Sequence, residues 1–164
     1  MVSAIVAIDA NLGIGCENKL LISIPEDLKR FKEITTGHTV VMGSNTWRSL
    51  PRKPLPNRRN IILSRKKEPY PHDEYLRMTD KEFSYWLEDH PNEEVFIMGG
   101  ARTYADYIDI CDRIYLTYIH KSFKDVDAYF PNFFDYGEWK MIEVSDIKTY
   151  ENIEYHFVTY ERIN

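Results

Sequence analysis

The stretch Glu94-Val95-Phe96-Ile97-Met98-Gly99-Gly100-Ala101-Arg102 contains the pattern that decides the fold. A short apolar run ends at two glycines, and a helix-like segment from Ala101 to Ile108 follows at once. The stretch Val41-Met42-Gly43-Ser44-Asn45-Thr46 repeats this arrangement. Short, near-continuous apolar runs are typical of strands that are covered on both faces, as in parallel sheets. Both stretches therefore predict a buried strand that leads through glycine into a helix.

Further apolar runs extend this pattern along the chain. They are Ala4 to Ile8, Thr39 to Met42, Asn60 to Leu63 and Arg113 to Ile119. Helix-like segments, Pro25 to Thr35 and Thr79 to Asp89, lie between several of them, and the second begins with a capping-box pattern. Near the C-terminus, Glu138 to Val144 and Asn152 to Glu161 resemble two strands with no helix between them. We expect an α/β fold with a single domain over residues 1–164: a doubly wound, mostly parallel eight-stranded sheet, an antiparallel C-terminal edge hairpin and about four flanking helices.

Length and composition limit the class of protein. The chain of 164 residues, 43% hydrophobic and 29% charged, suits one compact globular domain. No apolar run approaches the roughly 20 residues of a membrane-spanning helix, and the first residues lack the features of a secretory signal. Cys16 and Cys111 show no metal-ligand spacing. We expect a soluble, cytoplasmic, monomeric protein without a metal site, a disulfide or a membrane partner.

The charge of the chain is unevenly distributed. The net charge is −5, yet no Asp or Glu occurs between Ile34 and Lys67, where eight Lys and Arg residues lie. A basic region within an acidic protein favours a small anionic ligand over a nucleic acid, which usually requires a basic domain. A solvated surface loop is the alternative interpretation of this region.

The two glycine turns predict an anion site. Glycine lets a ligand approach the backbone, and the start of a helix offers unpaired N–H groups. Because carboxyl ends of parallel strands meet at one edge of a sheet, two such turns would hold a diphosphate from both sides. A third strand end, Leu63-Ser64-Arg65-Lys66-Lys67, adds positive charge there and favours NADPH over NADH. Each turn alone could also be an ordinary connection between a strand and a helix, with no ligand.

Asp27 is the most informative single residue. On a helix that begins at Pro25 it shares one side with Leu28, Phe31 and Ile34. A carboxylate among apolar neighbours must be paired, protonated or functional. Alternatively, Asp27 satisfies N–H groups of the first helical turn. The opposite side of the helix is predicted to carry the charged residues Glu26, Lys29, Arg30 and Glu33.

Two connecting segments complete the candidate site. Residues Asn11 to Leu20 contain two glycines without clear periodicity, and we expect a mobile loop that could close over a ligand. The stiff segment Pro54-Leu55-Pro56-Asn57-Arg58-Arg59 ends in two arginines, which suit the bidentate capture of a carboxylate but also occur in ordinary surface loops. Lys66 to Tyr75, with two prolines, is predicted to be a surface loop.

Six motifs, in order and with consistent spacing, resemble bacterial dihydrofolate reductase. They are Ile14-Gly15-Cys16-Glu17-Asn18, Ile24-Pro25-Glu26-Asp27-Leu28-Lys29-Arg30-Phe31-Lys32, Val41-Met42-Gly43-Ser44-Asn45-Thr46-Trp47, Pro54-Leu55-Pro56-Asn57-Arg58-Arg59-Asn60-Ile61-Ile62-Leu63-Ser64, Met98-Gly99-Gly100-Ala101-Arg102-Thr103-Tyr104 and Tyr115-Leu116-Thr117. The resemblance runs from the first strand almost to the C-terminus. It implies an NADPH-dependent enzyme that reduces 7,8-dihydrofolate to tetrahydrofolate and binds antifolates.

The resemblance also implies a role for each matching residue. Catalysis would involve Asp27, Leu20, Thr117 and Tyr104. The substrate would contact Ile5, Asp27, Leu28, Phe31, Leu50, Leu55, Arg58 and Thr117, with Arg58 on the α-carboxylate of the glutamate tail. NADPH would contact Ala7, Ile14, Asn18, Lys19, Leu20, Gly43, Ser44, Asn45, Thr46, Leu63, Ser64, Arg65, Met98, Gly99, Gly100, Ala101, Arg102, Thr103 and Tyr104. The Gly99–Gly100 peptide would be cis.

In this family a hydride passes from nicotinamide C4 to pterin C6, and N5 gains a proton. Asp27 would lie too far around the ring to protonate N5, so a water admitted beside Leu20 is the expected donor. The chain departs from the family pattern twice. Leu21-Ile22 replaces the usual Pro-Trp, whose indole normally anchors a water, and Ser44 replaces a frequent Arg. Arg65, assisted by Arg102 or Lys66, is therefore the expected partner of the 2′-phosphate.

Two other interpretations stay open at this point. A related NADPH-dependent reductase of riboflavin synthesis shares the fold, but we would not expect it to combine the Asp27 helix with Arg58. A non-enzymatic nucleic-acid-binding derivative would show a strongly salt-dependent affinity for polynucleotide and no oxidation of NADPH. The acidic composition, with a pI near 5.6, disfavours the second of these.

Overall fold

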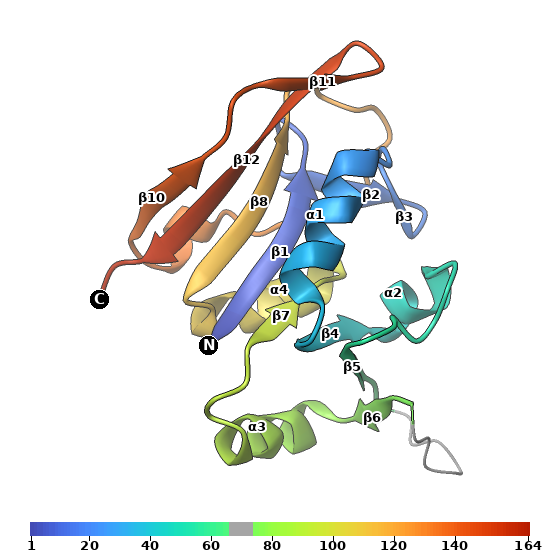
Figure 1. Ribbon diagram of the computed structural model, residues 1–164, viewed down its shortest axis with the longest axis vertical. Helices are drawn as coiled ribbons and strands as arrows, with labels where there is room; N and C mark the ends of the chain where they lie inside the picture. Colours follow the sequence, from blue (N-terminus) through green and yellow to red (C-terminus); the bar gives the residue numbers. More distant parts are fainter. Residues whose placement is uncertain (66–73) are drawn as a thin grey trace.

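A central sheet organises the molecule (Figure 1). The computed structural model describes residues 1–65 and 74–164, so most of the predicted loop from Lys66 to Tyr75 lies outside the described residues. Within those two ranges, eight strands follow one another across the sheet. Their order is β10 (Trp139–Val144), β12 (Ile153–Arg162), β8 (Arg113–Ile119), β1 (Val2–Ile8), β7 (Val95–Ile97), β4 (Thr39–Gly43), β5 (Arg59–Leu63) and β6 (Leu76–Met78). All pairs from β8 to β6 are parallel, which confirms the predicted fold class.

Helices cover both faces of this sheet, with α1 in front and α4 behind in Figure 1. The helices are α1 (Pro25–Thr35), α2 (Ser44–Ser49), α3 (Asp80–Asp89) and α4 (Ala101–Tyr107). The 3-10 turn η1 (Ile108–Ile110) follows α4, and the 3-10 turn η2 (Phe133–Tyr136) precedes β10. The predicted capping box at the start of α3 is present. Glu82 N donates to Thr79 Oγ1 at 3.2 Å, and Thr79 N donates to Glu82 Oε1 at 3.1 Å. No helix among the described residues is long and apolar enough to cross a membrane.

Successive side chains of each strand point to opposite faces of the sheet, and this divides the core into two layers. On β1, Ala4 and Val6 pack in the cluster that contains Tyr104 of α4, whereas Ile5 packs in the cluster that contains Phe31 of α1. Because successive strand residues point to opposite faces, the two clusters lie on opposite sides of the sheet. The near-continuous apolar runs in the sequence therefore reflect strands that are buried on both faces.

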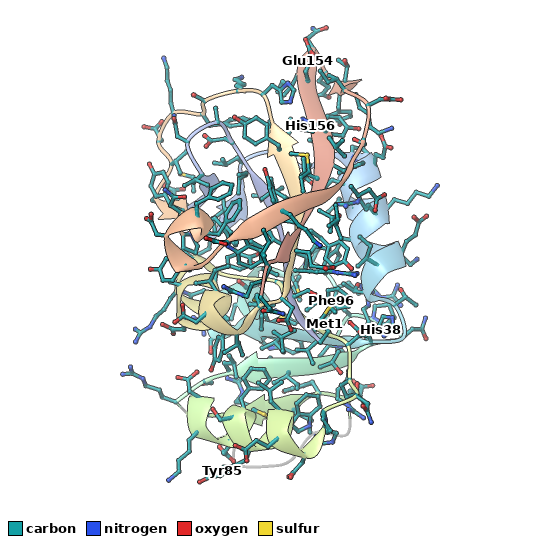
Figure 2. All side chains as sticks on the ribbon, turned by 90° about the vertical axis from the view of Figure 1, so that its left-hand side faces the viewer. Met1, His38, Tyr85, Phe96, Glu154 and His156 are labelled. Carbon is teal, nitrogen blue, oxygen red and sulfur yellow. The ribbon has the colours of Figure 1, made fainter. Side chains whose placement is uncertain are left out.

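The core layer between α1 and the sheet includes a contact between two aromatic side chains that are both labelled in Figure 2. Phe96 of β7 lies beside His38, the residue before β4, and their ring centres are 5.9 Å apart. Phe96 is buried and belongs to the same cluster as Ile5. This contact packs the turn between α1 and β4 against the sheet, and so helps to fix where α1 lies.

The predicted C-terminal hairpin is present at one edge of the sheet. β10 pairs antiparallel with β12, and β12 pairs antiparallel with β8, so the later strand of the hairpin lies inside and the earlier one forms the edge. In this register Phe157 lies directly opposite Thr117. The additional strand β11 (Lys148–Tyr150), which pairs with β12, and the short β6 were not predicted, because three residues carry too little periodicity.

The prediction of a loop without regular structure between Asn11 and Leu20 was wrong. This segment contains β2 (Gly13–Cys16) and β3 (Lys19–Leu20), which form a small sheet with β9 (Ala128–Tyr129). The buried Asp9 fixes its start, since Oδ1 accepts hydrogen bonds from Asn11 N and Gly13 N, both at 2.8 Å. Partners more than a hundred residues away in sequence supply the third strand, so local periodicity could not reveal this sheet.

Candidate functional site

The two glycine turns meet at the carboxyl edge of β4 and β7, which are neighbours in the sheet. We call Gly43 and the pair Gly99–Gly100 the glycine corners. Gly43 N donates to Gly99 O at 2.9 Å, and the Gly99–Gly100 peptide is cis, as the family resemblance implied. A Cβ atom on Gly43 would lie 2.9 Å from Thr103 Oγ1 and 4.0 Å from Gly100 N. A side chain at Gly43 would therefore crowd the Thr103 hydroxyl at the start of α4.

Each glycine corner is the N-cap of a helix, and neither helix has a side-chain cap. Gly43 precedes α2 and Gly100 precedes α4, so first-turn N–H groups of both helices are free of capping side chains at the same sheet edge. Such N–H groups are ready-made donors to an anion. The residues present thus fit a diphosphate of a dinucleotide, as the sequence pattern predicted.

The structure supports the cations that were predicted for this edge to different degrees. Arg65 lies two residues after the end of β5 and is exposed, whereas Lys66 lies outside the described residues. Arg102 is also exposed, and its Nε lies 3.8 Å from Asp106 Oδ2, so part of its charge is already balanced. Ser44 Oγ donates to Leu63 O at 3.4 Å, which ties the start of α2 to the end of β5. Arg65 therefore stays the best candidate for an additional phosphate.

Asp27 lies on the side of α1 that faces the sheet, where its carboxylate accepts a hydrogen bond from the Thr117 hydroxyl of β8. Thr117 is buried and is the register partner of Ala7 on β1. Burial raises the pKa of Asp27, while the Thr117 hydrogen bond and the positive charge of Arg30 act in the opposite direction. A partly buried carboxylate with a perturbed pKa is typical of a functional site.

The apolar residues predicted to contact substrate are mostly gathered beside Asp27. Ile5, Phe31, Leu50 and Leu55 belong to one cluster, together with Val40, Met42 and Trp47. Leu28 is different, because 46% of its surface is exposed on α1. The cluster provides an apolar wall from β1, α1 and the segment after α2.

Arg58 closes the far end of this wall. Its Nε donates to Pro56 O at 2.9 Å, its Nη1 donates to Thr35 Oγ1 at 3.2 Å, and its Cζ lies 5.8 Å from the ring centre of Phe31. These contacts hold the guanidinium in one orientation. Desolvation lowers the pKa of Arg58, as expected for a half-buried cation.

Tyr104 links the two halves of the site. Its hydroxyl donates to Ile5 O at 2.6 Å, and its ring lies edge-on to Phe130 with centres 4.9 Å apart. Burial strongly raises the pKa of Tyr104, so the phenol stays neutral. The ring is also close to the glycine corner, since a Cβ on Gly99 would lie 3.7 Å from Tyr104 Oη. Tyr104 thereby fixes α4 against β1.

Residues of the small sheet flank the same edge. Ile14 is half-buried against the core, while Asn18, Lys19 and Leu20 are exposed, with Leu20 at 54%. Asn18 adopts a φ of 63°, which forms the tight turn between β2 and β3. The remaining predicted cofactor residues, Asn45, Thr46, Ser64, Met98 and Ala101, lie on or beside the ends of β4, β5 and β7.

The prediction that Arg30 lies on the side of α1 opposite Asp27 was wrong. Its guanidinium carbon lies 4.5 Å from the ring centre of Phe157, and the side chain is half-buried. The i, i+3 spacing from Asp27 places both residues on the same side of α1, and this spacing could have revealed the arrangement. Phe157 itself could not have been found, because its position depends on long-range strand pairing.

Known proteins resemble the chain over its full length. Residues 1–162 match the family model described as "Dihydrofolate reductase". A dihydrofolate reductase of Bacillus subtilis is 39% identical over 168 aligned positions, which cover 100% of this chain and 96% of that protein. One from Staphylococcus haemolyticus is 34% identical and covers 99% of this chain and 96% of that protein. The solved structure of "Dihydrofolate reductase from Enterococcus faecalis complexed with NADP(H)and RAB-propyl" superposes with a TM-score of 0.86 at 30% identity, covering 100% of this chain and 97% of that one.

Proposed function

The chain belongs to the dihydrofolate reductase family, which reduces dihydrofolate to tetrahydrofolate with NADPH, and we propose that Asp27 and the glycine corners carry this activity here. The observation that carries the assignment is the placement of a half-buried carboxylate and of two uncapped helix starts along one sheet edge. The carboxylate suits a polar heterocycle, and the two helix starts suit a dinucleotide.

On the substrate side, Asp27 would accept hydrogen bonds from pyrimidine N3 and the 2-amino group of the pterin. The Thr117 hydroxyl, which already donates to Asp27, would orient the carboxylate and supply a further contact. Ile5, Phe31, Leu50 and Leu55 would enclose the ring and exclude water, with Leu28 at the margin. Arg58, held by Pro56 and Thr35, would bind the α-carboxylate of the glutamate tail.

On the cofactor side, NADPH would supply the hydride from nicotinamide C4. First-turn N–H groups of α2 and α4, at Ser44 to Thr46 and at Ala101 to Thr103, would hold the diphosphate. Arg65 would pair with the 2′-phosphate, with Arg102 as a weaker second partner. Ala7, Ile14 and the segment Asn18 to Leu20 would lie at the nicotinamide end.

The family's indole position is filled by an aliphatic residue here. Ile22 packs against the buried cluster of Ile24, Ile119, Tyr155 and Phe157. It has no donor with which to anchor a water, so the protonation of N5 would depend on a water that enters beside the exposed Leu20. Asp27 would raise the basicity of N5 through its charge without donating a proton to it.

The ligands would be small molecules, namely dihydrofolate, NADPH and antifolates, bound by a monomer in the cytoplasm. The net charge of −5 supports this proposal over nucleic-acid binding, which needs a positive surface.

The direct test follows the absorbance of NADPH in the presence of dihydrofolate, with and without an antifolate. We expect absorbance to fall only when both substrates are present, and the antifolate to stop the fall. No reaction with dihydrofolate, together with oxidation of NADPH by a riboflavin-pathway pyrimidine, would assign the chain to the related reductase. Salt-dependent polynucleotide binding without oxidation would favour the non-enzymatic alternative.

A further inference from the structure

Arg30 is a cation in aromatic surroundings that the residue roles above do not use. Its guanidinium carbon lies 4.5 Å from the ring centre of Phe157 and 6.0 Å from that of Tyr115. The negative face of an aromatic ring attracts a guanidinium, and stacking restricts its planar group. Arg30 is therefore held against the sheet, although it is a long and otherwise flexible side chain.

The same part of the sheet holds Asp27. Thr117, which donates to the Asp27 carboxylate, lies opposite Phe157 on β12 and two residues after Tyr115 on β8. Side chains in these three positions share one face of the sheet. Asp27 and Arg30, at i and i+3, share one side of α1. We call Asp27, Arg30, Tyr115, Thr117 and Phe157 the Asp27 cluster. In it the Thr117 hydroxyl donates to the Asp27 carboxylate, and the rings of Tyr115 and Phe157 contact the Arg30 guanidinium.

Arg30 is not part of a contact ion pair within the described residues. Among residues 1–65 and 74–164, no carboxylate oxygen lies within 4.0 Å of an Arg30 nitrogen. Burial lowers the pKa of Arg30, while Asp27, Glu143 on β10 and Tyr115 act in the opposite direction and favour its charged form. Arg30 can therefore act on Asp27 through space without forming a salt bridge with it.

Other titratable groups near Asp27 do not supply a competing positive charge. Glu26 on α1 accepts from the Tyr155 hydroxyl at 2.7 Å and lies 3.2 Å from Lys148 Nζ, so this lysine is already paired. Tyr104 of α4 and Tyr155 of β12 both have raised pKa values and stay neutral. In the part of the chain that the structure describes, Arg30 is the cation whose charge opposes the effect of burial on Asp27.

We propose that Arg30 is a positioning residue for Asp27. Held on the rings of Phe157 and Tyr115, its positive charge stays on the side of α1 that carries Asp27 and favours the carboxylate that accepts from Thr117. The titration of Asp27 does not depend on the proposed function. What the ionised carboxylate then does for substrate rests on that function.

The test is a titration of Asp27 by carbon NMR in the full-length protein labelled at aspartate carboxyls. The Asp27 signal is identified by its absence in Asp27→Asn. Arg30→Met keeps an unbranched apolar stem but removes the charge, and we expect the Asp27 midpoint to rise by roughly half a pH unit or more, the size of effect that one charge exerts over several Å in partly aqueous surroundings. Arg30→Lys, which keeps the charge but loses the planar group that stacks on the rings, is the matched control and should raise the midpoint less than Arg30→Met does.

An unchanged midpoint in Arg30→Met, with a wild-type circular dichroism spectrum, would overturn the proposal, as would an equal rise in Arg30→Lys. If Arg30→Met does not fold, Arg30→Gln gives the same comparison with a polar side chain. The pH profile of NADPH oxidation by dihydrofolate is measured in parallel. If the wild-type protein oxidises no NADPH, the proposed function fails, whereas the NMR midpoints still decide the role of Arg30.

Discussion

The glycine corners and the Asp27 cluster lie along the same sheet but are built differently. The corners act through backbone, since Gly43 and Gly99 meet by a main-chain hydrogen bond of 2.9 Å and an added Cβ on Gly43 would crowd the Thr103 hydroxyl. The Asp27 cluster acts through side chains from α1, β8 and β12. Substitutions at the glycine corners should therefore affect NADPH and spare dihydrofolate, and substitutions in the Asp27 cluster should do the reverse. Measurements on each ligand can test this difference.

The largest effect is expected from Asp27→Asn. The amide keeps the shape but cannot carry the negative charge that raises the basicity of the substrate, so hydride transfer at neutral pH should fall by roughly a hundredfold or more. Single-turnover kinetics measures this rate. The dissociation constant for NADPH, measured by fluorescence, should change less than about twofold, and equal losses in both quantities would contradict the separation of the two regions.

Gly43→Ala should give the reverse pattern. The new Cβ would meet Thr103 Oγ1 at 2.9 Å, so the Thr103 side chain or the start of α4 must shift. Overpacking of this kind costs about 1 to 3 kcal/mol, so NADPH binding should weaken by roughly tenfold to a hundredfold while dihydrofolate binding is retained. Calorimetric titration with each ligand measures both.

Gly37→Ala is the matched control for that variant. Gly37 has a φ of 85°, and a Cβ added there would meet nothing within 4 Å, so alanine adds backbone strain without crowding the corner. It should lower the melting temperature and leave NADPH affinity unchanged. Loss of NADPH binding in Gly37→Ala would show that global destabilisation, rather than the corner, is being measured.

Arg65→Ala tests the cation beside the corners. Loss of one charge-assisted contact of about 1.5 to 3 kcal/mol should raise KM for NADPH roughly tenfold or more, with little change for NADH. Steady-state kinetics with both cofactors gives the ratio. Arg102→Ala, which removes a cation already near Asp106, should have the smaller effect. An unchanged preference for NADPH in Arg65→Ala would reassign the phosphate partner.

The smallest effect concerns stability. Burial raises the pKa of Asp27 above its ordinary value of 3.8, so its protonated form is the one that the fold favours. The stability that this group contributes is complete below the unfolded pKa and is lost as pH rises through the folded pKa. Asp27→Asn should therefore be more stable than wild type at pH 7, with the difference shrinking toward pH 4. Urea unfolding at several pH values tests this, and a less stable variant at pH 7 would contradict it.

The two regions also differed in how far sequence could predict them. Gly43, Gly99 and Gly100 each follow an apolar run, and parallel strands bring such ends to one edge, so local pattern was enough. Asp27 was found from the helical spacing of Leu28 and Phe31. Arg30 was misplaced although its i, i+3 spacing from Asp27 was visible in the sequence. Its aromatic partners, Phe157 and Tyr115, could not be predicted, because they come from strands whose register no local pattern encodes.

The small sheet shows the same limit. β2 and β3 are short and contain two glycines, so the segment has no periodicity of its own. Its order comes from β9 and from Asp9, which accepts hydrogen bonds from Asn11 N and Gly13 N. Most of the parallel sheet could thus be predicted, while the elements that depend on distant partners could not.

The position of β12 between β8 and β10 sets an order of events during synthesis. β8 is complete at Ile119, but its outer edge stays unpaired until residues 153–162 have been made. Because a domain generally folds as a unit, the sheet that carries the glycine corners is completed only together with these residues. Phe157, the ring on which Arg30 stacks, belongs to the same segment. The last long strand to be synthesised therefore closes the central sheet and completes the surroundings of Asp27 in one step.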